Sequence, residues 1–189
     1  MSHNRRIGDN VHWLKYTRQR GISQPMTDLT YVTDEMRAAQ GRWGEPWTAP
    51  PITATDIRRW AMATFYPEQP PRIYWDADYA ATTQWGGIVA PPDFNPFAWP
   101  VERPRGRGSP GLSGRRPDGK PLTGMNGGQT DTYGVPMRPG DVISARNRLV
   151  DWWEREGRLG HTLYVRSEIE WRNQDDELVR TRFSIGIRY

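Results

Sequence analysis

Few side chains in this sequence are suited to nucleophilic or metal chemistry. Cysteine is absent, which excludes disulfides, a cysteine nucleophile and thiolate metal ligands. Only three histidines occur, His3, His12 and His161, and the first two lie near the N-terminus. A zinc or iron centre built from several histidines is therefore not expected, and no metal site is predicted.

Basic side chains gather in one Gly- and Pro-rich stretch. Residues 101–120 contain six Arg or Lys against two Asp or Glu, so this stretch alone accounts for the net charge of +4. Such a patch suits a phosphate-bearing ligand, a carrier or nucleic acid, and a solvated loop is the alternative interpretation. The residues singled out as candidate phosphate ligands are Arg103, Arg105 and Arg107.

The length and composition are those of one aromatic-rich domain. The chain has 189 residues, ten of them Trp, which is enough to bury a core without cross-links. We expect an N-terminal arm at 1–40 and one domain at 41–189, with a basic Gly- and Pro-rich insertion at about 95–128. No apolar run approaches the roughly 18 residues of a membrane span, and no apolar signal region is present, so we expect a cytoplasmic protein without membrane contact.

Capping residues predict three helices in the first half of the chain. Each cap has a side-chain oxygen that can accept a hydrogen bond from a backbone N–H at the start of the helix. The caps are Thr33, Thr53 (with Asp56 forming a shortened capping box) and Asp76. The second helix must end before Pro67, and the third is expected to end at Gly86.

The C-terminal third alternates apolar and polar residues with a period of two. Three runs of strand length, 142–153, 162–172 and 178–188, are separated by turn-like segments at 154–157 and 173–176. This pattern predicts an antiparallel meander with one apolar face and one solvated face. Helices followed by such a meander predict an α+β domain.

Two long segments, 57–92 and 127–189, resemble the MaoC-like, hot-dog-fold acyl-CoA dehydratases and hydratases. The second contains Pro-Gly-Asp at 139–141, E-x-E-G-x-x-G at 154–160 and N-Q-D-x-E-L-V at 173–179. This order is similar to the N-terminal, FAS1-like dehydratase variety, and the resemblance covers about residues 40–189 apart from the insertion. It implies a hot-dog fold, in which an antiparallel sheet wraps around a central helix.

The resemblance also implies where catalytic residues should lie. In that family a Gly-Asp-x-Asn-Pro-x-His run precedes an Asp-x-x-Tyr-Ala helix, and its Asp and His activate a water that adds to an enoyl thioester. The segment 76–80 matches the helix. Gln69 then aligns with the Asp and Tyr74 with the His. Glu68 could align with the Asp only if the alignment contained a gap of one or two residues. The acid–base dyad is therefore missing from its expected place.

The absence of the family's Asp and His from their expected positions leaves three possible functions. The favoured one is the silent half of a heteromeric hydratase, which binds the thioester in a groove shared with a catalytic MaoC-like subunit. An alternative is a self-sufficient homodimeric hydratase that uses other residues, with His161 and Asp131 as candidates. A non-enzymatic thioester-binding or nucleic-acid-binding protein is the third. Nucleic acid is disfavoured because no aromatic residue lies between Trp99 and Tyr133 to stack on bases.

Substrate binding is expected from a short run before the insertion. Glycines allow a backbone to approach a ligand closely, although a plain turn would also use them. The predicted binding residues are Gly86, Gly87, Ile88, Val89 and Ala90. No cofactor is expected other than coenzyme A as part of the substrate, and a dimer through sheet edges is expected because open edges are pairing templates.

Overall fold

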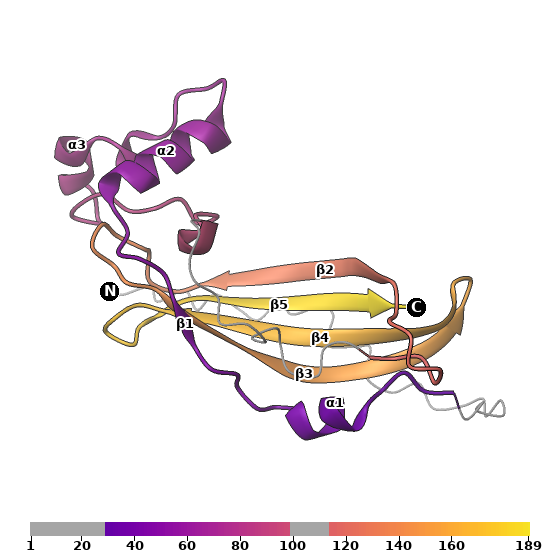
Figure 1. The fold of residues 1–189 in the computed structure, drawn as a ribbon. Helices are drawn as coiled ribbons and strands as arrows, with labels where there is room; N and C mark the ends of the chain where they lie inside the picture. Colours follow the sequence, from indigo (N-terminus) through magenta and orange to yellow (C-terminus); the bar gives the residue numbers. More distant parts are fainter. Residues whose placement is uncertain (1–28, 99–113) are drawn as a thin grey trace, which may run out of the picture.

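The computed structural model describes residues 29–98 and 114–189 as an α+β chain built on a five-stranded antiparallel sheet (Figure 1). The order of the strands in the sheet is β1-β3-β4-β5-β2. The strands are β1 (Trp47–Thr48), β2 (Gly124–Tyr133), β3 (Ser144–Gly157), β4 (Gly160–Arg172) and β5 (Leu178–Arg188). The helices are α1 (Asp34–Ala39), α2 (Ala54–Phe65) and α3 (Ala77–Ala81), with 3₁₀ turns η2 (Arg72–Tyr74) and η3 (Pro96–Ala98). The predicted α+β class is confirmed.

The three predicted helix caps are confirmed. Thr33 and Asp76 each accept a hydrogen bond from the backbone N–H three residues on. At α2, the Thr53 hydroxyl accepts from the Asp56 N–H at 3.1 Å, and the Asp56 carboxylate accepts from the Thr53 N–H at 3.0 Å. These bonds satisfy amide groups that the first helical turn leaves free, so each helix begins where its local sequence dictates.

The predicted end of the third helix is wrong. Helix α3 ends at Ala81, five residues before Gly86. The hydroxyls of Thr82 and Thr83 donate to backbone carbonyls three residues back, at 2.7 and 2.8 Å. Hydroxyl groups that bond locally to the backbone compete with the helix ladder, which ends the helix early.

The predicted meander of three C-terminal strands is confirmed, but its first turn is shorter than expected. The segment 154–157 pairs with β4 as part of β3, as far as Gly157 opposite Gly160. Only Arg158 and Leu159 form the loop, and Gly160 has a positive φ of 79°. A tight turn followed by a residue with positive φ is a common way to close a short hairpin, and glycine adopts that conformation without strain, so Gly160 favours the turn here. The turn at 173–176 is confirmed by the hydrogen bond from Asn173 N–H to the Glu177 carbonyl at 3.1 Å.

Strand β2 was not predicted. Its sequence, GMNGGQTDTY, lacks apolar alternation, yet it pairs antiparallel with β5 along its length, with one bulge at Gly127. Its first five residues belong to the insertion expected at 95–128, so that insertion is not irregular to its end; residues 99–113 lie outside the described part. Backbone pairing with a regular neighbour stabilises β2, and hydrophobic periodicity plays little part.

The expectation of one apolar and one solvated sheet face is wrong because of the register between β4 and β5. Residues opposite each other in antiparallel strands share a face. Ile169 is opposite Arg182, and Glu168 is opposite Phe183, so each face mixes the apolar residues of one strand with polar residues of the other. Glu168 and Glu170 are also buried, at 7% exposure each, and pair with Arg148 and Arg146 on β3.

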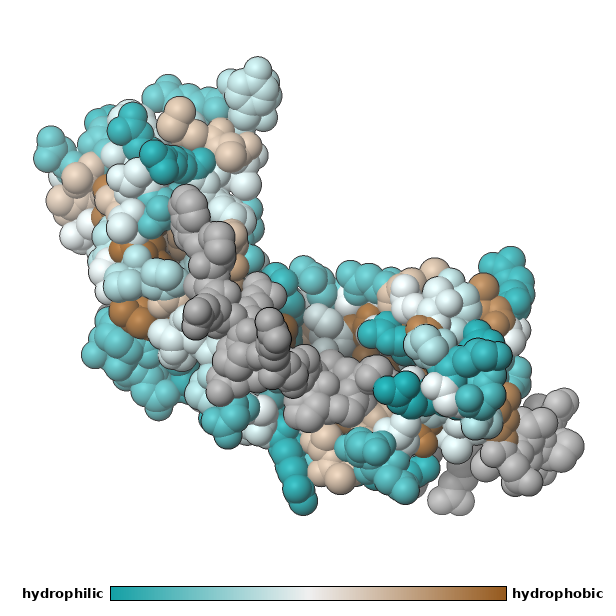
Figure 2. All heavy atoms as spheres, in the orientation of Figure 1, coloured by the Kyte–Doolittle hydropathy of each residue, from teal (hydrophilic) through white to brown (hydrophobic). Residues whose placement is uncertain are grey.

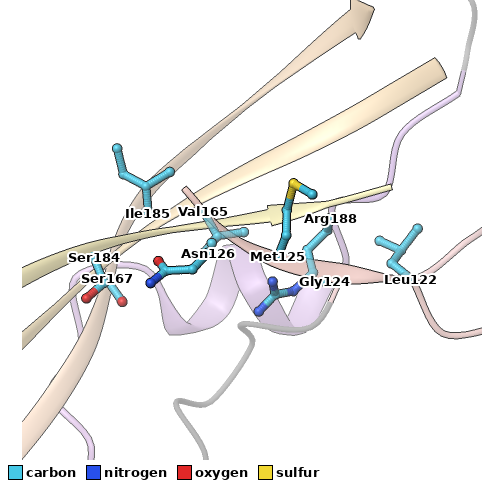
Figure 3. Close-up of a pocket in the computed structure, with 10 residues that line it drawn as sticks. Leu122, Gly124, Met125, Asn126, Val165, Ser167, Ser184, Ile185 and Arg188 are labelled. Carbon is cyan, nitrogen blue, oxygen red and sulfur yellow. The ribbon is translucent and has the colours of Figure 1, made fainter. Parts of the chain in front are cut away.

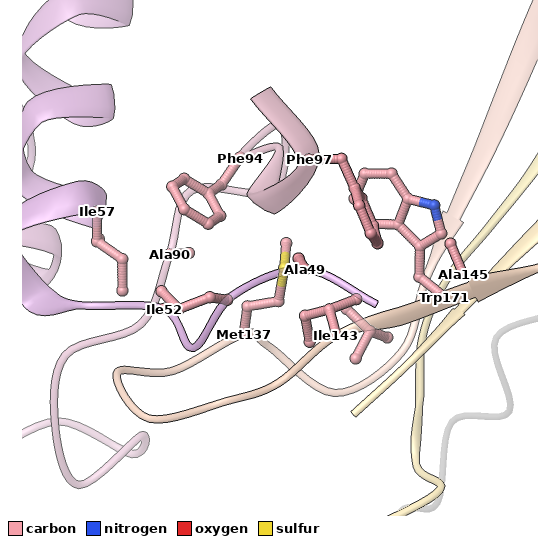
Figure 4. Packing of buried hydrophobic residues seen from close by; sticks show 11 residues of the cluster. Ala49, Ile52, Ile57, Ala90, Phe94, Phe97, Met137, Ile143, Ala145 and Trp171 are labelled. Atoms are coloured by element: carbon pink, nitrogen blue, oxygen red, sulfur yellow. The ribbon is translucent and has the colours of Figure 1, made fainter. Parts of the chain in front are cut away.

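One hydrophobic core lies at the end of the sheet from which the helical segment rises (Figure 4). Ile57 from α2 and Met137 from the β2–β3 connection are buried there. Phe97 packs edge-on against Trp171 of β4, with ring centroids 5.4 Å apart. In Figures 1 and 2 this helical segment stands at an angle to the sheet, so the described chain has an L-shaped outline.

A second core lies towards the other end of the sheet. Tyr31, which precedes α1, and Met36, which lies within it, pack against Leu149, Leu163 and Val165. The described part of the predicted N-terminal arm therefore packs on the domain, while residues 1–28 lie outside the described part. Within the described ranges, no helix combines the length and apolarity needed to cross a membrane.

Candidate functional site

A cavity of about 230 Å³ lies between the segment 73–92 and the neighbouring ends of β2 and β5. Trp85 and Tyr133 are exposed at its rim, at 40% and 51%. Its floor is apolar and buried, and is formed by Val89, Ala90, Pro91, Met137 and Val179. A solvent-facing aromatic rim above an apolar floor is the usual shape of a site for a small, largely apolar ligand.

The wall of the cavity is positioned by local sequence. Arg72 clamps the helix cap Asp76 through Nε and Nη2, at 2.9 and 2.6 Å from the same carboxylate oxygen. Gly86, with φ of 63°, turns the chain back towards the sheet. The Ala90 N–H then donates to the Met137 carbonyl at 2.8 Å, which fixes this segment beside the β2–β3 connection.

The predicted binding run 86–90 only partly lines the cavity. Val89 and Ala90 do so, at 5% and 6% exposure. Ile88 packs against the hydrophobic core instead. Gly86 and Gly87 do not line the cavity, and a side chain at Gly87 would approach only the Arg138 guanidinium, at 3.9 Å. Ligand binding by this run stays a prediction.

The two positions that align with the missing dyad are separated by the structure. Tyr74 lines the cavity, whereas Gln69 is exposed in the preceding loop and lies outside the lining. Burial, with a smaller effect from Asp93, raises the pKa of the Tyr74 hydroxyl above its ordinary value. Tyr74 is therefore protonated at neutral pH and can donate a hydrogen bond, but it is not a base.

Arg180 is a cavity residue that the sequence did not single out. It is 2% exposed, its Nη2 donates to the Phe94 carbonyl at 2.8 Å, and its guanidinium carbon lies 3.6 Å from the Trp171 ring centroid. Burial, followed by repulsion from Arg182, lowers its pKa below the ordinary arginine value. The alternation of β5 places arginines at both 180 and 182, and no pattern in the sequence distinguishes the buried one.

Asp131, a predicted alternative catalytic residue, lies next to this site but not in its lining. Its two oxygens accept from Nε and Nη2 of Arg182, both at 2.7 Å. The hydrogen bonds from Arg182 lower the pKa of Asp131 below its ordinary value despite partial burial. A carboxylate so stabilised as an anion is a poor proton acceptor, so the geometry does not favour Asp131 as a general base.

His161, the other alternative, lies at the opposite end of β4 from the cavity. Its Nδ1 is 2.7 Å from Glu156 and its Nε2 is 3.0 Å from Glu154. Burial lowers its pKa, but the hydrogen bonds to Glu156 and Glu154 outweigh burial and raise the pKa above the ordinary value. Trp171, beside the cavity, is ten residues from His161, about 33 Å at strand spacing. The structure does not bring His161 to the predicted site.

A larger open trough of about 570 Å³ lies over β4, β5 and β2 (Figure 3). Ser167 and Ser184 are opposite each other across β4 and β5, and their small side chains leave the space. In Figure 3 they point to one side of the sheet, and Ile185 and Met125 point to the other. Among the described residues that line the trough, none is a predicted site residue.

The predicted phosphate ligands Arg103, Arg105 and Arg107 lie outside the described residues. The described end of the basic stretch is solvated: Arg115, Arg116 and Lys120 are exposed, and Lys120 pairs with Asp118 at 3.0 Å. Across residues 29–98 and 114–189, His, Asp and Glu side chains form no group of three or more suited to a metal ion.

The α+β class and the five-stranded antiparallel sheet agree with the hot-dog-type domain that the resemblance implied. A family model described as the FAS1-like dehydratase domain region matches residues 38–182. The chain belongs to this family, as the resemblance implied. Comparison with curated proteins gives no match.

Several solved structures share the fold of this chain. A chain of the ChsH1-ChsH2 complex from Mycobacterium tuberculosis is 23% identical, with a TM-score of 0.60 over 82% of this chain and 86% of that one. A MaoC-like dehydratase from Rhodospirillum rubrum is 16% identical, with a TM-score of 0.51 over 77% and 91%. A chain of the HadBC (3R-hydroxyacyl-ACP dehydratase) complex from Mycobacterium tuberculosis is 18% identical, with a TM-score of 0.50 over 76% and 95%.

Proposed function

We propose that this chain is the acyl-thioester-binding subunit of an enoyl-thioester hydratase (equally, a 3-hydroxyacyl-thioester dehydratase), and that a partner supplies the catalytic Asp and His. The observation that carries the proposal is the lining of the cavity. Its titratable members among the described residues are Tyr74, Tyr133 and Arg180, with neither a histidine nor a carboxylate. Hydration of an enoyl thioester needs a base to activate water and an acid to protonate carbon, and tyrosine and arginine are not bases near neutral pH.

The open edge of the sheet supports a partner. Strand β2 is the last strand of the sheet among the described residues, and it pairs with β5 on one side only. Its ten residues contain no proline, and nine of them are exposed. A long edge without proline is a template for pairing with another strand. Two of the similar solved structures, ChsH1-ChsH2 and HadBC, are complexes of two named components, which favours a heteromer over a homodimer.

The other candidate functions receive less support. A self-sufficient hydratase would need His161 or Asp131. His161 lies at the end of β4 opposite the cavity, and the Asp131 carboxylate already accepts hydrogen bonds from Arg182. A nucleic-acid binder would need aromatic stacking beside the basic stretch, and the described end of that stretch is a solvated turn.

Reconstitution tests the proposed function. The full chain is purified and mixed with a MaoC-like subunit that carries the Asp and His, and the mixture is followed by light scattering and by loss of the enoyl absorbance of crotonyl-CoA. A stable complex with hydratase activity greater than that of either component is expected. Failure to form a complex or to gain activity would contradict the subunit role.

A further inference from the structure

Beside its apolar floor the cavity has one buried charged side chain, Arg180, which an ordinary fatty acyl group would not use. Exposed aromatic residues form the rim, and Arg180 lies beside the buried floor residues. An acyl thioester with the bulky coenzyme outside would enter from the rim, so the distal end of its acyl group would reach Arg180. The following inference rests on the proposed function and concerns the chemistry of that distal end.

The guanidinium of Arg180 is short of hydrogen-bond acceptors. It has five N–H donors. One donates to the Phe94 carbonyl at 2.8 Å. Nη1 is 3.8 Å from the Asp131 carboxylate, which is longer than a hydrogen bond, and Nε has no partner although it is fully buried. Buried polar groups in proteins are nearly always satisfied, so the unpaired Nε donor needs an explanation.

The charge of Arg180 is also incompletely balanced. Asp131 gives both of its oxygens to Arg182, so one carboxylate faces two guanidinium groups. Asp93, the other carboxylate near Arg180, is exposed, so water screens its charge and it compensates the guanidinium little. A buried cation without its own anion is destabilised strongly, and the aromatic face of Trp171 compensates only part of that cost.

We propose that the acyl group bound in this cavity ends in a carboxylate, and that this carboxylate pairs with Arg180. The ligand class is thus the monothioester of a short dicarboxylic acid. Arg180 lacks a hydrogen-bond acceptor and a negative charge to balance its own, and a carboxylate supplies both. The cavity of about 230 Å³ accommodates a short acyl chain and leaves the coenzyme outside.

Two thioesters of equal acyl length provide the test. Pentanoyl-CoA and glutaryl-CoA both carry five acyl carbons, and they differ by a methyl or a carboxylate at the distal end. Titration calorimetry of the full chain measures both affinities. Because charge-assisted hydrogen bonds are the strong ones, glutaryl-CoA is expected to bind roughly ten-fold more tightly or better. The preference is expected to disappear in Arg180→Gln and to persist in Arg188→Gln, a control on the same strand that lines the other cavity.

The outcomes of this titration distinguish failure of the carboxylate inference from failure of the proposed function. If glutaryl-CoA has no advantage while pentanoyl-CoA binds, the inference is wrong and the proposed function stands. If neither thioester binds but free glutarate does, and only with Arg180 present, the anion site is real and the proposed function is wrong. If no ligand binds, both are wrong. Should Arg180→Gln fail to fold by circular dichroism, the ratio of the two affinities in the unmodified chain decides alone.

Discussion

Replacing Asp131 by asparagine is expected to destabilise the chain strongly, because it removes a carboxylate that two arginines share. Asp131 is 12% exposed, Arg182 is 29% exposed and Arg180 is 3% exposed at their side chains. Breaking a buried ion pair costs about 3–5 kcal/mol, and the partial exposure of Arg182 reduces the expected loss for Asp131→Asn to about 2–3 kcal/mol. Urea unfolding followed by tryptophan fluorescence at pH 7 measures it.

The sheet provides a matched control for this substitution. Asp151 pairs with Arg166 through the same two guanidinium nitrogens, but both side chains are about 40% exposed, at 39% and 40%. Exposed ion pairs contribute at most about 1 kcal/mol, so Asp151→Asn is expected to change the free energy of unfolding little. Equal losses for Asp131→Asn and Asp151→Asn would refute the argument that burial and the shared carboxylate set the magnitude.

The pH dependence gives a second readout of the same pair. The pKa of Asp131 is lowered in the folded chain, chiefly by hydrogen bonds from Arg182. Its stabilisation is therefore present above the unfolded pKa, about 3.9, and is lost as the pH falls through the lower folded pKa. The difference in unfolding free energy between the unmodified chain and Asp131→Asn should stay constant from neutral pH to about pH 5, and shrink below about pH 4.

Three further variants concern other parts of the molecule. Trp85→Ala, at the exposed rim, is expected to weaken acyl-CoA binding roughly ten-fold with little change in Tm; unchanged binding would place the ligand elsewhere. His161→Ala is expected to lower stability without changing acyl-CoA binding; because its folded pKa is raised, the loss should be full below about pH 6.5 and fade as the pH rises through the folded pKa. Neutralising Arg103, Arg105 and Arg107 together is expected to weaken ligand or partner binding and to reduce its salt dependence, and unchanged binding at low and high salt would leave a solvated stretch.

Features determined by neighbouring residues could be predicted from the sequence. The caps at Thr33, Thr53 and Asp76 depend on a side chain and an amide three residues apart, so local sequence sufficed. Likewise, the alternation in 162–172 and 178–188 was enough to predict two long strands.

Features determined by pairing between distant segments could not be predicted. Strand β2 is rich in glycine and polar residues, and only its pairing with β5 makes it a strand. The register that places Arg182 opposite Ile169 depends on the β4–β5 pairing, and alternation alone does not reveal which faces coincide. For the same reason the sequence did not distinguish buried Arg180 from its neighbours. The positions of Gln69 and Tyr74 followed from the resemblance, but only the structure places Tyr74 at the cavity and Gln69 outside it.

Binding and turnover measured on one preparation of the isolated chain test the central claim most directly. Crotonyl-CoA is titrated against the full chain by calorimetry, and the same sample is assayed for hydration. Saturable binding without appreciable turnover is expected, because the cavity lining among the described residues carries no base. Robust turnover by the isolated chain, abolished in His161→Ala, would contradict the central claim.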